Sequence, residues 1–365
     1  MNTVAYLHIG AFLTTLALTL LLTALAIRFA ARVGYVDRPG GHKSHRAPVP
    51  YGGGVAIFAS AWLVMIAAFA ATVLISPDWV AARFGETMRD YQGGLRGQAL
   101  ELAAILLGGA MLHVLGLYDD VRPQGPWVKL TVMVLVGALV SGVGGVRVLD
   151  MAGGIWATVI TTAWFVVIIN AFNFLDNMDG LSAGVAAICT VALALCGLLA
   201  GQVFVPALGC IFLGALCGFL VFNLPPARIF MGDAGSLVIG YMLAILSTLT
   251  TYYESGGDRP AYALMMPLVV LAVPLYDFVS VVGIRLLEGR NPMAGDQRHF
   301  SHRLVEHGLS RRFAVFTIYL ATGATSLAAT LLPGADLRRT ATVVLVVFLV
   351  LLIIAILETP PRKAA

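Results

Sequence analysis

The chain has 365 residues, of which 59% are hydrophobic and only 12% are charged, and its mean hydropathy is +0.90. Soluble domains carry about 25% charged residues, so this composition excludes a water-soluble globular protein and indicates an integral membrane protein. The net charge of +4 is small, so the distribution of the charges is more informative than their sum. All four cysteines fall in apolar runs, where we interpret them as packing residues rather than as metal ligands or disulfide partners.

Eleven apolar runs are long enough, or nearly so, to cross a hydrocarbon core of about 30 Å as helices. They cover residues 4–27, 52–75, 99–118, 127–146, 154–172, 181–200, 203–222, 235–253, 262–283, 313–332 and 340–357. No Lys or Arg precedes the first run, so we interpret it as a retained span rather than a signal peptide. The runs predict an all-α polytopic membrane protein with a single transmembrane domain over residues 1–365.

Basic residues predict the orientation, because cytoplasmic loops are enriched in Lys and Arg. One set of alternate loops holds 16 of these side chains and the other holds 7. The richer set begins at residue 28, which places the N-terminus outside and the C-terminus in the cytoplasm. The stretches rich in unusual polar residues all fall on this cytoplasmic side: 28–51, 118–129, 170–184, 223–236 and 284–312. A transporter would place such residues near the middle of its spans, so this pattern favours an enzyme at the inner leaflet.

The first two polar stretches differ in charge. The glycine- and proline-rich loop after the first run carries Lys43, which is suited to an anion or serves only as a topogenic charge. The third run ends in the adjacent carboxylates Asp119 and Asp120, where the helix C-terminus is itself partially negative. This arrangement is favourable if a cation such as Mg²⁺ is present, and the alternative is an exposed pair at a turn.

The central stretch reads NAFNFLDNMDGLSAG over Asn170–Gly184. Carboxylates at a membrane boundary cost free energy unless they are hydrated, paired or bound to a metal. Asn173, Asp176 and Asp179 follow one another at spacings of three residues, which puts them on one side of a helix or tight turn. We interpret them as the floor of a polar site.

The last two stretches suggest phosphate binding. Gly232-Asp233-Ala234-Gly235-Ser236 opens the eighth run, where free backbone N–H groups suit an anion and Asp233 is either a ligand or a helix cap. His299, His302 and Arg303 supply donors in the last large loop, unless they are incidental to a basic loop. Carboxylates for a divalent cation together with cationic donors indicate phosphoryl transfer.

Five motifs now identify a resemblance: DRPGGHKSHRAPVPYGGG, GLYDDVRP, NAFNFLDNMDGLSAG, NLPPARIFMGDAGS and RHFSHRLVEHG. In this order they resemble the polyprenyl-phosphate N-acetylhexosamine-1-phosphate transferase family, over nearly the whole chain from Asp37 to about His307. The resemblance implies transfer of a sugar 1-phosphate, by default GlcNAc 1-phosphate from UDP-GlcNAc, to undecaprenyl phosphate with release of UMP. It also implies a Mg²⁺ or Mn²⁺ ion and a place at the start of cell-envelope glycan synthesis, such as O-antigen or teichoic acid.

The resemblance carries roles onto residues of this chain. Asp119 becomes the candidate base or ion-proximal carboxylate, with Asp120 beside it and Asp176 near the metal. Asp233 becomes a direct metal ligand. Asn173 is a further candidate for contact with the substrate. The residues that match family positions near the nucleotide, the phosphates or the sugar are Asp179, Asn223, Phe230, Lys43, Lys129, His299, His302 and Arg303.

Several alternatives remain at this level. Two mechanisms are open. In one, Asp119 deprotonates the lipid phosphate, which attacks directly; in the other, an Asp attacks first and forms a covalent phospho-enzyme. We favour direct attack, because a phosphate monoester is already largely dianionic and needs little help from a base. The muramyl-pentapeptide translocase carries three consecutive histidines where this chain has His299-Phe-Ser-His302, which favours the initiating glycan transferases. A transporter of anionic sugar or lipid is the alternative from another class. We expect no nucleic-acid partner, and a homodimer stays open.

Overall fold

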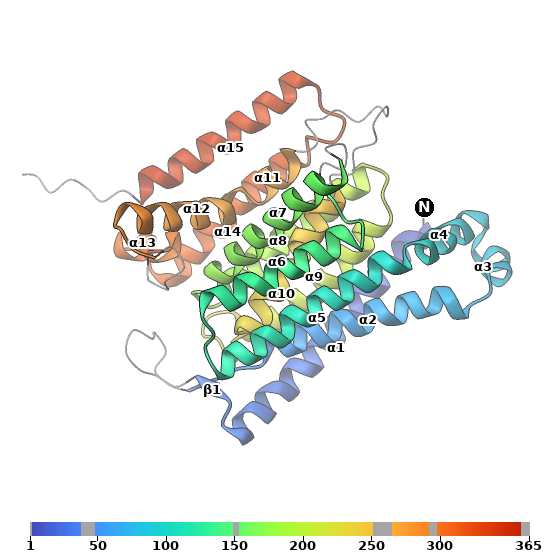
Figure 1. Ribbon diagram of the computed structural model, residues 1–365, viewed down its shortest axis with the longest axis horizontal. Coiled ribbons are helices and arrows are strands. Elements are labelled where there is room, and N and C mark those ends of the chain that lie inside the picture. Colours follow the sequence, from blue (N-terminus) through green and yellow to red (C-terminus); the bar gives the residue numbers. More distant parts are fainter. Residues whose placement is uncertain (1, 38–47, 149–152, 251–264, 292–297, 359–365) are drawn as a thin grey trace, which may run out of the picture.

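The computed structural model describes residues 2–37, 48–148, 153–250, 265–291 and 298–358, so Lys43 lies outside the described residues (Figure 1). Within these ranges the chain is almost entirely helical, which confirms the all-α prediction. The exception is a short antiparallel pair, β1 (Val36–Asp37) and β2 (Val49–Pro50), in which Val36 faces Pro50.

Nine of the described helices are long and apolar enough to cross a membrane. They are α1 (Asn2–Val33), α2 (Gly53–Leu74), α5 (Ala99–Val121), α7 (Gly154–Leu175), α8 (Leu181–Leu199), α9 (Phe204–Asn223), α10 (Asp233–Thr250), α14 (Arg311–Ala329) and α15 (Leu337–Leu357). The run expected at 127–146 forms the shorter helix α6 (Pro126–Gly142). The run expected at 262–283 falls on α11 (Met266–Val270) and α12 (Ala272–Leu287). The count of eleven spans therefore stays a prediction.

The break between α11 and α12 has a local cause. Pro274 has no backbone N–H, so it cannot donate to the carbonyl of Val270 one turn earlier. The two helices are separated at Leu271, whose own N–H donates to the carbonyl of Pro267 in α11. Three shorter helices complete the described fold: α3 (Pro77–Phe84), α4 (Glu86–Gly97) and α13 (Phe300–Glu306).

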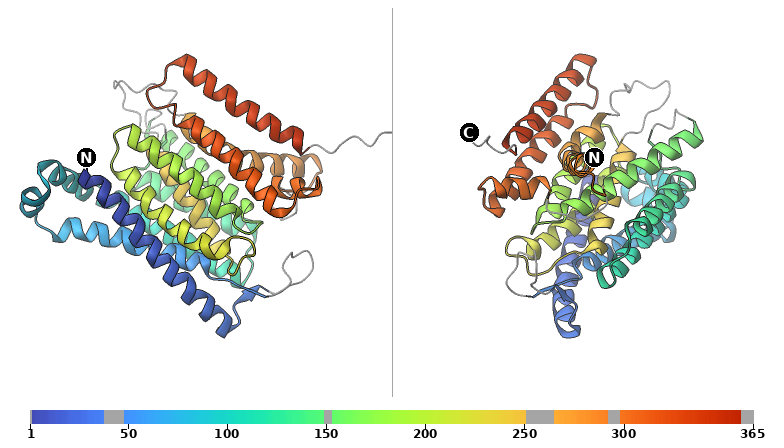
Figure 2. Two further views of the ribbon diagram at one scale, coloured as in Figure 1. Left: turned by 180° about the vertical axis from the view of Figure 1, so that it is seen from behind. Right: turned by 60° about the vertical axis from the view of Figure 1, so that its left-hand side comes forward.

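Helix α10 forms the centre of the bundle, surrounded by α5, α7, α8 and α2 (Figures 1 and 2). Nearly all of its side chains are buried. Glycines allow this close packing: a Cβ at Gly54 of α2 would lie 2.3 Å from the nitrogen of Gly235, and one at Gly240 would lie 2.6 Å from Cα of Ile169. Small residues at helix crossings are the usual means of close approach in membranes. Helix α15, by contrast, lies at the edge against α14 and α12.

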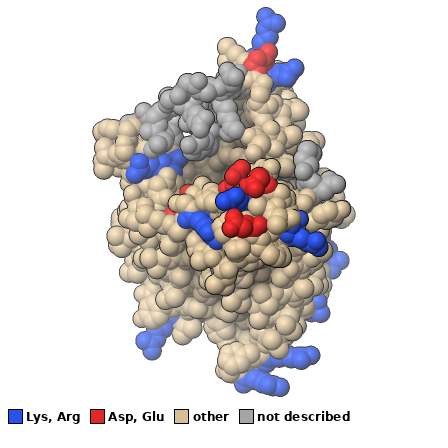
Figure 3. All heavy atoms as spheres, turned by 90° about the vertical axis from the view of Figure 1, so that its right-hand side faces the viewer, with Lys and Arg blue, Asp and Glu red and all other residues tan. Residues whose placement is uncertain are grey.

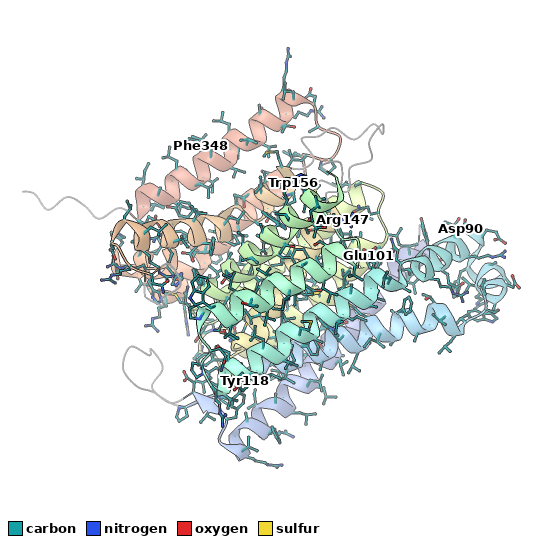
Figure 4. All side chains as sticks on the ribbon, in the orientation of Figure 1. Asp90, Glu101, Tyr118, Arg147, Trp156 and Phe348 are labelled. Carbon is teal, nitrogen blue, oxygen red and sulfur yellow. The ribbon has the colours of Figure 1, made fainter. Side chains whose placement is uncertain are left out.

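The two ends of the bundle differ. Figure 4 labels Tyr118 near one end and Asp90 at the other. The N-terminus and the hairpin of α3 and α4 lie at the Asp90 end. Figure 3 turns this side to the viewer and shows acidic and basic side chains gathered near its centre. Its charges include Arg89, which pairs with Asp78 at 3.7 Å and with Glu86 at 3.3 Å. The described parts of the five polar stretches meet at the Tyr118 end, as the topology count predicts.

Candidate active site

A cavity of about 610 Å³ opens at the Tyr118 end of the bundle. Its lining combines carboxylates with two arginines and the aromatic rings of Tyr51 and Phe230. Seven residues singled out from the sequence line it: Asp120, Asp176, Asp179, Asn223, Phe230, Asp233 and His302. Tertiary folding therefore brings together side chains that come from four of the five polar stretches.

Asp120 connects α5 to the start of α10. Its Oδ1 accepts from the backbone N–H of Asp233 at 2.7 Å, and its Oδ2 accepts from that of Ala234 at 3.2 Å. Asp120 thus satisfies the free N–H groups of a helix whose partial positive charge favours a carboxylate. Gly232, which precedes Asp233, has a φ of 66° and packs against the Asp120 carboxylate. A Cβ at Gly232 would lie 2.4 Å from Asp120 Oδ2. This carboxylate therefore holds the loop that carries Asp233 in place.

Lys129 of α6 links two other carboxylates. Its Nζ donates to Asp119 Oδ2 at 2.8 Å and to Asp233 Oδ2 at 2.6 Å. The second oxygen of Asp119 accepts from the backbone N–H of Gln124 at 2.8 Å. Asn173 of α7 donates to Asp233 Oδ1 at 3.0 Å. Asp119 does not line the cavity, so its geometry is that of a partner for Lys129.

Asp176 follows the last residue of α7 and lines the same cavity. Burial raises its pKa to about 8, and the neighbouring charges of Asp233, Asp120 and Asp179 act in the same direction. Desolvation and like charges both disfavour an ionised carboxylate. The cavity therefore carries an excess of negative charge around Asp176, which a bound cation would relieve.

The loop before α10 is held by two of the predicted substrate-binding residues. Asn223 accepts from the backbone N–H of Gly180 at 3.0 Å and donates to the carbonyl of Ile229 at 2.9 Å. Asp179 Oδ2 accepts from the backbone N–H of Ala227 at 3.0 Å. These bonds fasten the 223–232 loop to the turn after α7, and they place the Phe230 ring on the cavity wall, 6.1 Å from the ring of Tyr51.

Three of the four polar side chains at the start of α13 have partners in the rest of the fold. His299 Nδ1 lies 3.0 Å from Oδ2 of the buried Asp277, whose Oδ1 accepts from the N–H of Phe300 at 2.6 Å. Ser301 donates to Asn177 Oδ1 at 2.6 Å. Arg303, predicted to bind phosphate, pairs instead with Glu358 just after α15, at 2.9 Å.

His302 is the member of this segment that lines the cavity. Burial lowers the pKa of its imidazole, and the neighbouring positive charges of His299 and Arg311 lower it further. A neutral imidazole can both donate and accept a hydrogen bond, so His302 can contact either a phosphate or a hydroxyl.

Sequence reasoning missed five residues that the structure adds to the site or its support. Asp37, Tyr51, Arg311 and Arg312 line the cavity, and Asp277 holds His299. Asp277 carried a usable signal, since a carboxylate within an apolar run needs a partner. The two arginines carried none, because consecutive arginines after a span are also what topology requires.

The described residues contain no group of three or more His, Cys, Asp or Glu side chains arranged to hold a metal ion. Mg²⁺ is commonly held by one or two carboxylates with substrate phosphates and water as the other ligands. Asp176 and Asp233 supply two carboxylates at one cavity, and the negative charges of Asp233, Asp120 and Asp179 add to the effect of burial in raising the pKa of Asp176. The donor set thus fits a substrate-completed metal site.

Comparison with known proteins adds the family context. Residues 102–251 match the family described as glycosyl transferase family 4. The chain is 31% identical to the probable undecaprenyl-phosphate N-acetylglucosaminyl 1-phosphate transferase of Bacillus subtilis, over 94% of this chain and 90% of the relative. It is 32% identical to the decaprenyl-phosphate N-acetylglucosaminephosphotransferase of Mycobacterium tuberculosis, over 85% and 79%. It is 27% identical to the undecaprenyl-phosphate alpha-N-acetylglucosaminyl 1-phosphate transferase of Escherichia coli K12, over 83% and 78%.

Proposed function

We infer that this chain, which belongs to glycosyl transferase family 4, transfers N-acetylglucosamine 1-phosphate from UDP-GlcNAc to undecaprenyl phosphate and releases UMP. The observation that carries the proposal is the cavity at one end of a helical membrane bundle, lined by five carboxylates together with Arg311 and Arg312. This is the set of groups that phosphoryl transfer requires. The near full-length similarity to enzymes named for this reaction supports it.

The cavity offers separate regions for the parts of the donor. Phe230 and Tyr51 present aromatic rings suited to stacking on a base. Asp179 has one oxygen bound to the loop, which leaves the other for a ribose or uracil donor. We assign the phosphates to the region of Asp176 and Asp233, and His302 of α13 lines the same cavity.

We propose a Mg²⁺ or Mn²⁺ ion as the cofactor, held by Asp176 and Asp233 together with substrate phosphate oxygens. When bound, it would supply neutralisation of the negative charge on those oxygens. Lys129 donates a hydrogen bond to one oxygen of the Asp233 carboxylate, and Asn173 donates to the other. These bonds restrict the rotamer of Asp233 before substrate arrives.

The reaction proceeds by direct attack. An oxygen of the lipid phosphate forms a bond to the β-phosphorus of UDP-GlcNAc, the bond between that phosphorus and the bridging oxygen breaks, and UMP leaves with the bonding electrons. A phosphate monoester is largely dianionic near pH 7, so it needs little help from a base. Asp119 and Asp120 are engaged by Lys129 and by backbone N–H groups, respectively, which favours this route over a phospho-enzyme formed on either of them.

We further propose that the cavity faces the cytoplasm from the plasma membrane and that the lipid-linked product starts a cell-envelope glycan. The excess of basic residues in the loops at this end supports that orientation.

The test uses the purified full-length protein in detergent with undecaprenyl phosphate, Mg²⁺ and a panel of UDP-sugars. We expect UMP release with UDP-GlcNAc, loss of release on chelation and recovery on addition of Mg²⁺ or Mn²⁺. Asp176→Asn and Asp233→Asn should lose activity, whereas Asp78→Asn and Asp90→Asn at the opposite end should keep it. No turnover with any UDP-sugar would refute the proposal, and flux of lipid or sugar without UMP would favour a transporter.

A further inference from the structure

The cavity has a basic wall that neither the motifs nor the family resemblance assigns. Arg311 and Arg312 open α14 and line the cavity together with Val315 of the same helix. Among the described lining residues they are the only Lys or Arg side chains. The acidic lining residues are Asp37, Asp120, Asp176, Asp179 and Asp233. The lining therefore combines five carboxylates with two guanidinium groups.

The arginines are held in this position by the fold. Residues 311, 315 and 319 follow at intervals of four, so they lie on one face of α14. At the far end of this face the hydroxyl of Tyr319 donates to the carbonyl of Gly180. A Cβ at Gly184 would come within 1.9 Å of that hydroxyl, so the glycine leaves room for the contact. The face that carries Arg311 is thus fixed against the turn that carries Asp176 and Asp179.

The guanidinium groups remain available for a ligand. Neither Arg311 nor Arg312 forms an ion pair with another described residue, and both are exposed. Arg312 makes one long contact, 3.5 Å from Nη2 to the carbonyl of Pro225. Arg311 lies close enough to His302 for its charge to lower the pKa of that imidazole. Two cations that line a cavity together with carboxylates, and that form no ion pair with another described residue, indicate that an anion fits beside them.

We propose that Arg311 and Arg312 form a phosphate-binding site of this cavity, which takes a phosphate group of one of the two substrates. The site rests on the proposed function for the identity of those substrates. Guanidinium groups bind phosphate oxygens through paired N–H donors, and the ion pairs are strong where water is partly excluded. The phosphate belongs either to the nucleotide diphosphate donor or to the lipid monoester acceptor, and the two sources are separable by experiment.

The chain supplies a matched control for this pair. Arg338 and Arg339 are also consecutive arginines in the first turn of a helix, α15, behind the N-cap Asp336, and they lie at the opposite end of the bundle. Replacing them removes the same charge from the same kind of position without touching the cavity. The control therefore separates a local contact from a general effect of net charge.

The first experiment measures binding without turnover, by thermal-shift titration of the solubilised full-length protein. One arm compares UDP with uridine, and the other compares a short-chain polyprenyl phosphate with the corresponding polyprenol. Within each arm, the ratio of the two affinities measures what the phosphate contributes to binding. In Arg311→Ala and Arg312→Ala, we expect this ratio to fall about tenfold to a hundredfold in one arm. Arg311→Lys and Arg312→Lys should retain part of it, while Arg338→Ala and Arg339→Ala should match the wild type.

The second experiment measures KM for each substrate in the UMP-release assay. We expect KM to rise for the substrate identified by the binding arms, with a smaller change in kcat. Changes below threefold in both binding arms would overturn the site, whatever the activity of the variants. A wild-type protein without UMP release would instead overturn the proposed function, while the binding arms would still decide the role of the arginines.

Discussion

The carboxylate of Asp120, at the end of α5, accepts a hydrogen bond of 2.7 Å from the backbone N–H of Asp233, at the start of α10. The two residues are 113 positions apart, and each had been expected from its sequence motif to bind a metal ion. The contact gives them different roles. Both oxygens of Asp120, which also lines the cavity, accept from backbone N–H groups at the start of α10, and this contact holds Asp233 on the cavity wall with Asp176.

Replacing Asp120 should therefore affect the stability of the fold as well as activity. Asp120→Ala leaves the N–H groups of Asp233 and Ala234 without their acceptor, and loss of a helix cap costs about 1 kcal/mol. We expect a lower apparent melting temperature and a loss of UMP release. Asp120→Asn, which keeps one acceptor oxygen, should recover part of the stability. An Asp120→Ala protein that melts like the wild type would contradict this role.

Asp176 should behave in the opposite way. Among the described residues its carboxyl has no comparable partner. Its pKa is raised from 3.8 to about 8, so the folded metal-free protein keeps a proton that the unfolded chain releases. This group's contribution to stability is therefore present below about pH 4 and is lost as the pH rises to about 8. We expect Asp176→Asn to abolish activity yet raise the melting temperature of chelator-treated protein, with a larger gain at pH 9 than at pH 6. Equal destabilisation at both pH values would rule this out.

Lys129 should be energetically coupled to Asp119. The two side chains are paired at 2.8 Å and are only 22% and 11% exposed, respectively. If Asp119 serves to hold Lys129, then Lys129→Met and Asp119→Asn should be non-additive in thermal or denaturant unfolding. We expect a coupling free energy of about 1 to 2 kcal/mol. Additive losses would show that Asp119 acts independently of Lys129, as a separate ligand or base.

The ion pair between Arg303 and Glu358 should hold α13 against the end of α15. Both side chains are 12% exposed, and Arg303 also donates to Ser280 Oγ at 2.8 Å. We expect Glu358→Gln to lower stability by about 2 kcal/mol and to reduce kcat/KM through displacement of His302 on α13. The exposed pair of Arg89 and Glu86 is the control, where Glu86→Gln should change stability by less than about 0.5 kcal/mol.

An exchange of charges tests the same pair further. Glu358→Arg combined with Arg303→Glu should recover part of the stability that either single reversal loses. If the double variant were no better than the worse single one, the pair would not be the contact that holds α13.

Gly116 should be intolerant of the smallest side chain. A Cβ there would lie 2.4 Å from the nitrogen of Ala234, so Gly116→Ala must push α5 away from the first turn of α10. Overpacking of this kind typically costs about 1 to 3 kcal/mol. Gly283→Ala on α12 is the control, since a Cβ there meets no atom within 4 Å. We expect loss of activity in the first variant and near-normal melting and activity in the second; equal behaviour of the two would refute the close packing.

Much of this molecule could be predicted from residue patterns alone. Apolar runs of about twenty residues specify helices, because a chain in lipid must satisfy its own backbone hydrogen bonds. The alternation of basic loops predicted that the polar stretches lie on one side of the membrane, and their described parts lie at one end of the bundle. Asp176 and Asp233 were expected at one site because isolated carboxylates beside apolar runs need a partner or a cation, and both line the same cavity.

The tertiary structure decided which polar atoms remain free, a question that no local pattern answers. Asp119 and Asp120 are adjacent, yet one pairs with Lys129 and the other with the start of α10. Arg303 of the basic motif is engaged by Glu358, whereas Arg311, which no motif marked, faces the cavity. Periodicity reports which face of a helix is apolar, while a hydrogen bond depends on direction and on a separation near 3 Å. That separation is fixed only when helices distant in sequence pack against one another.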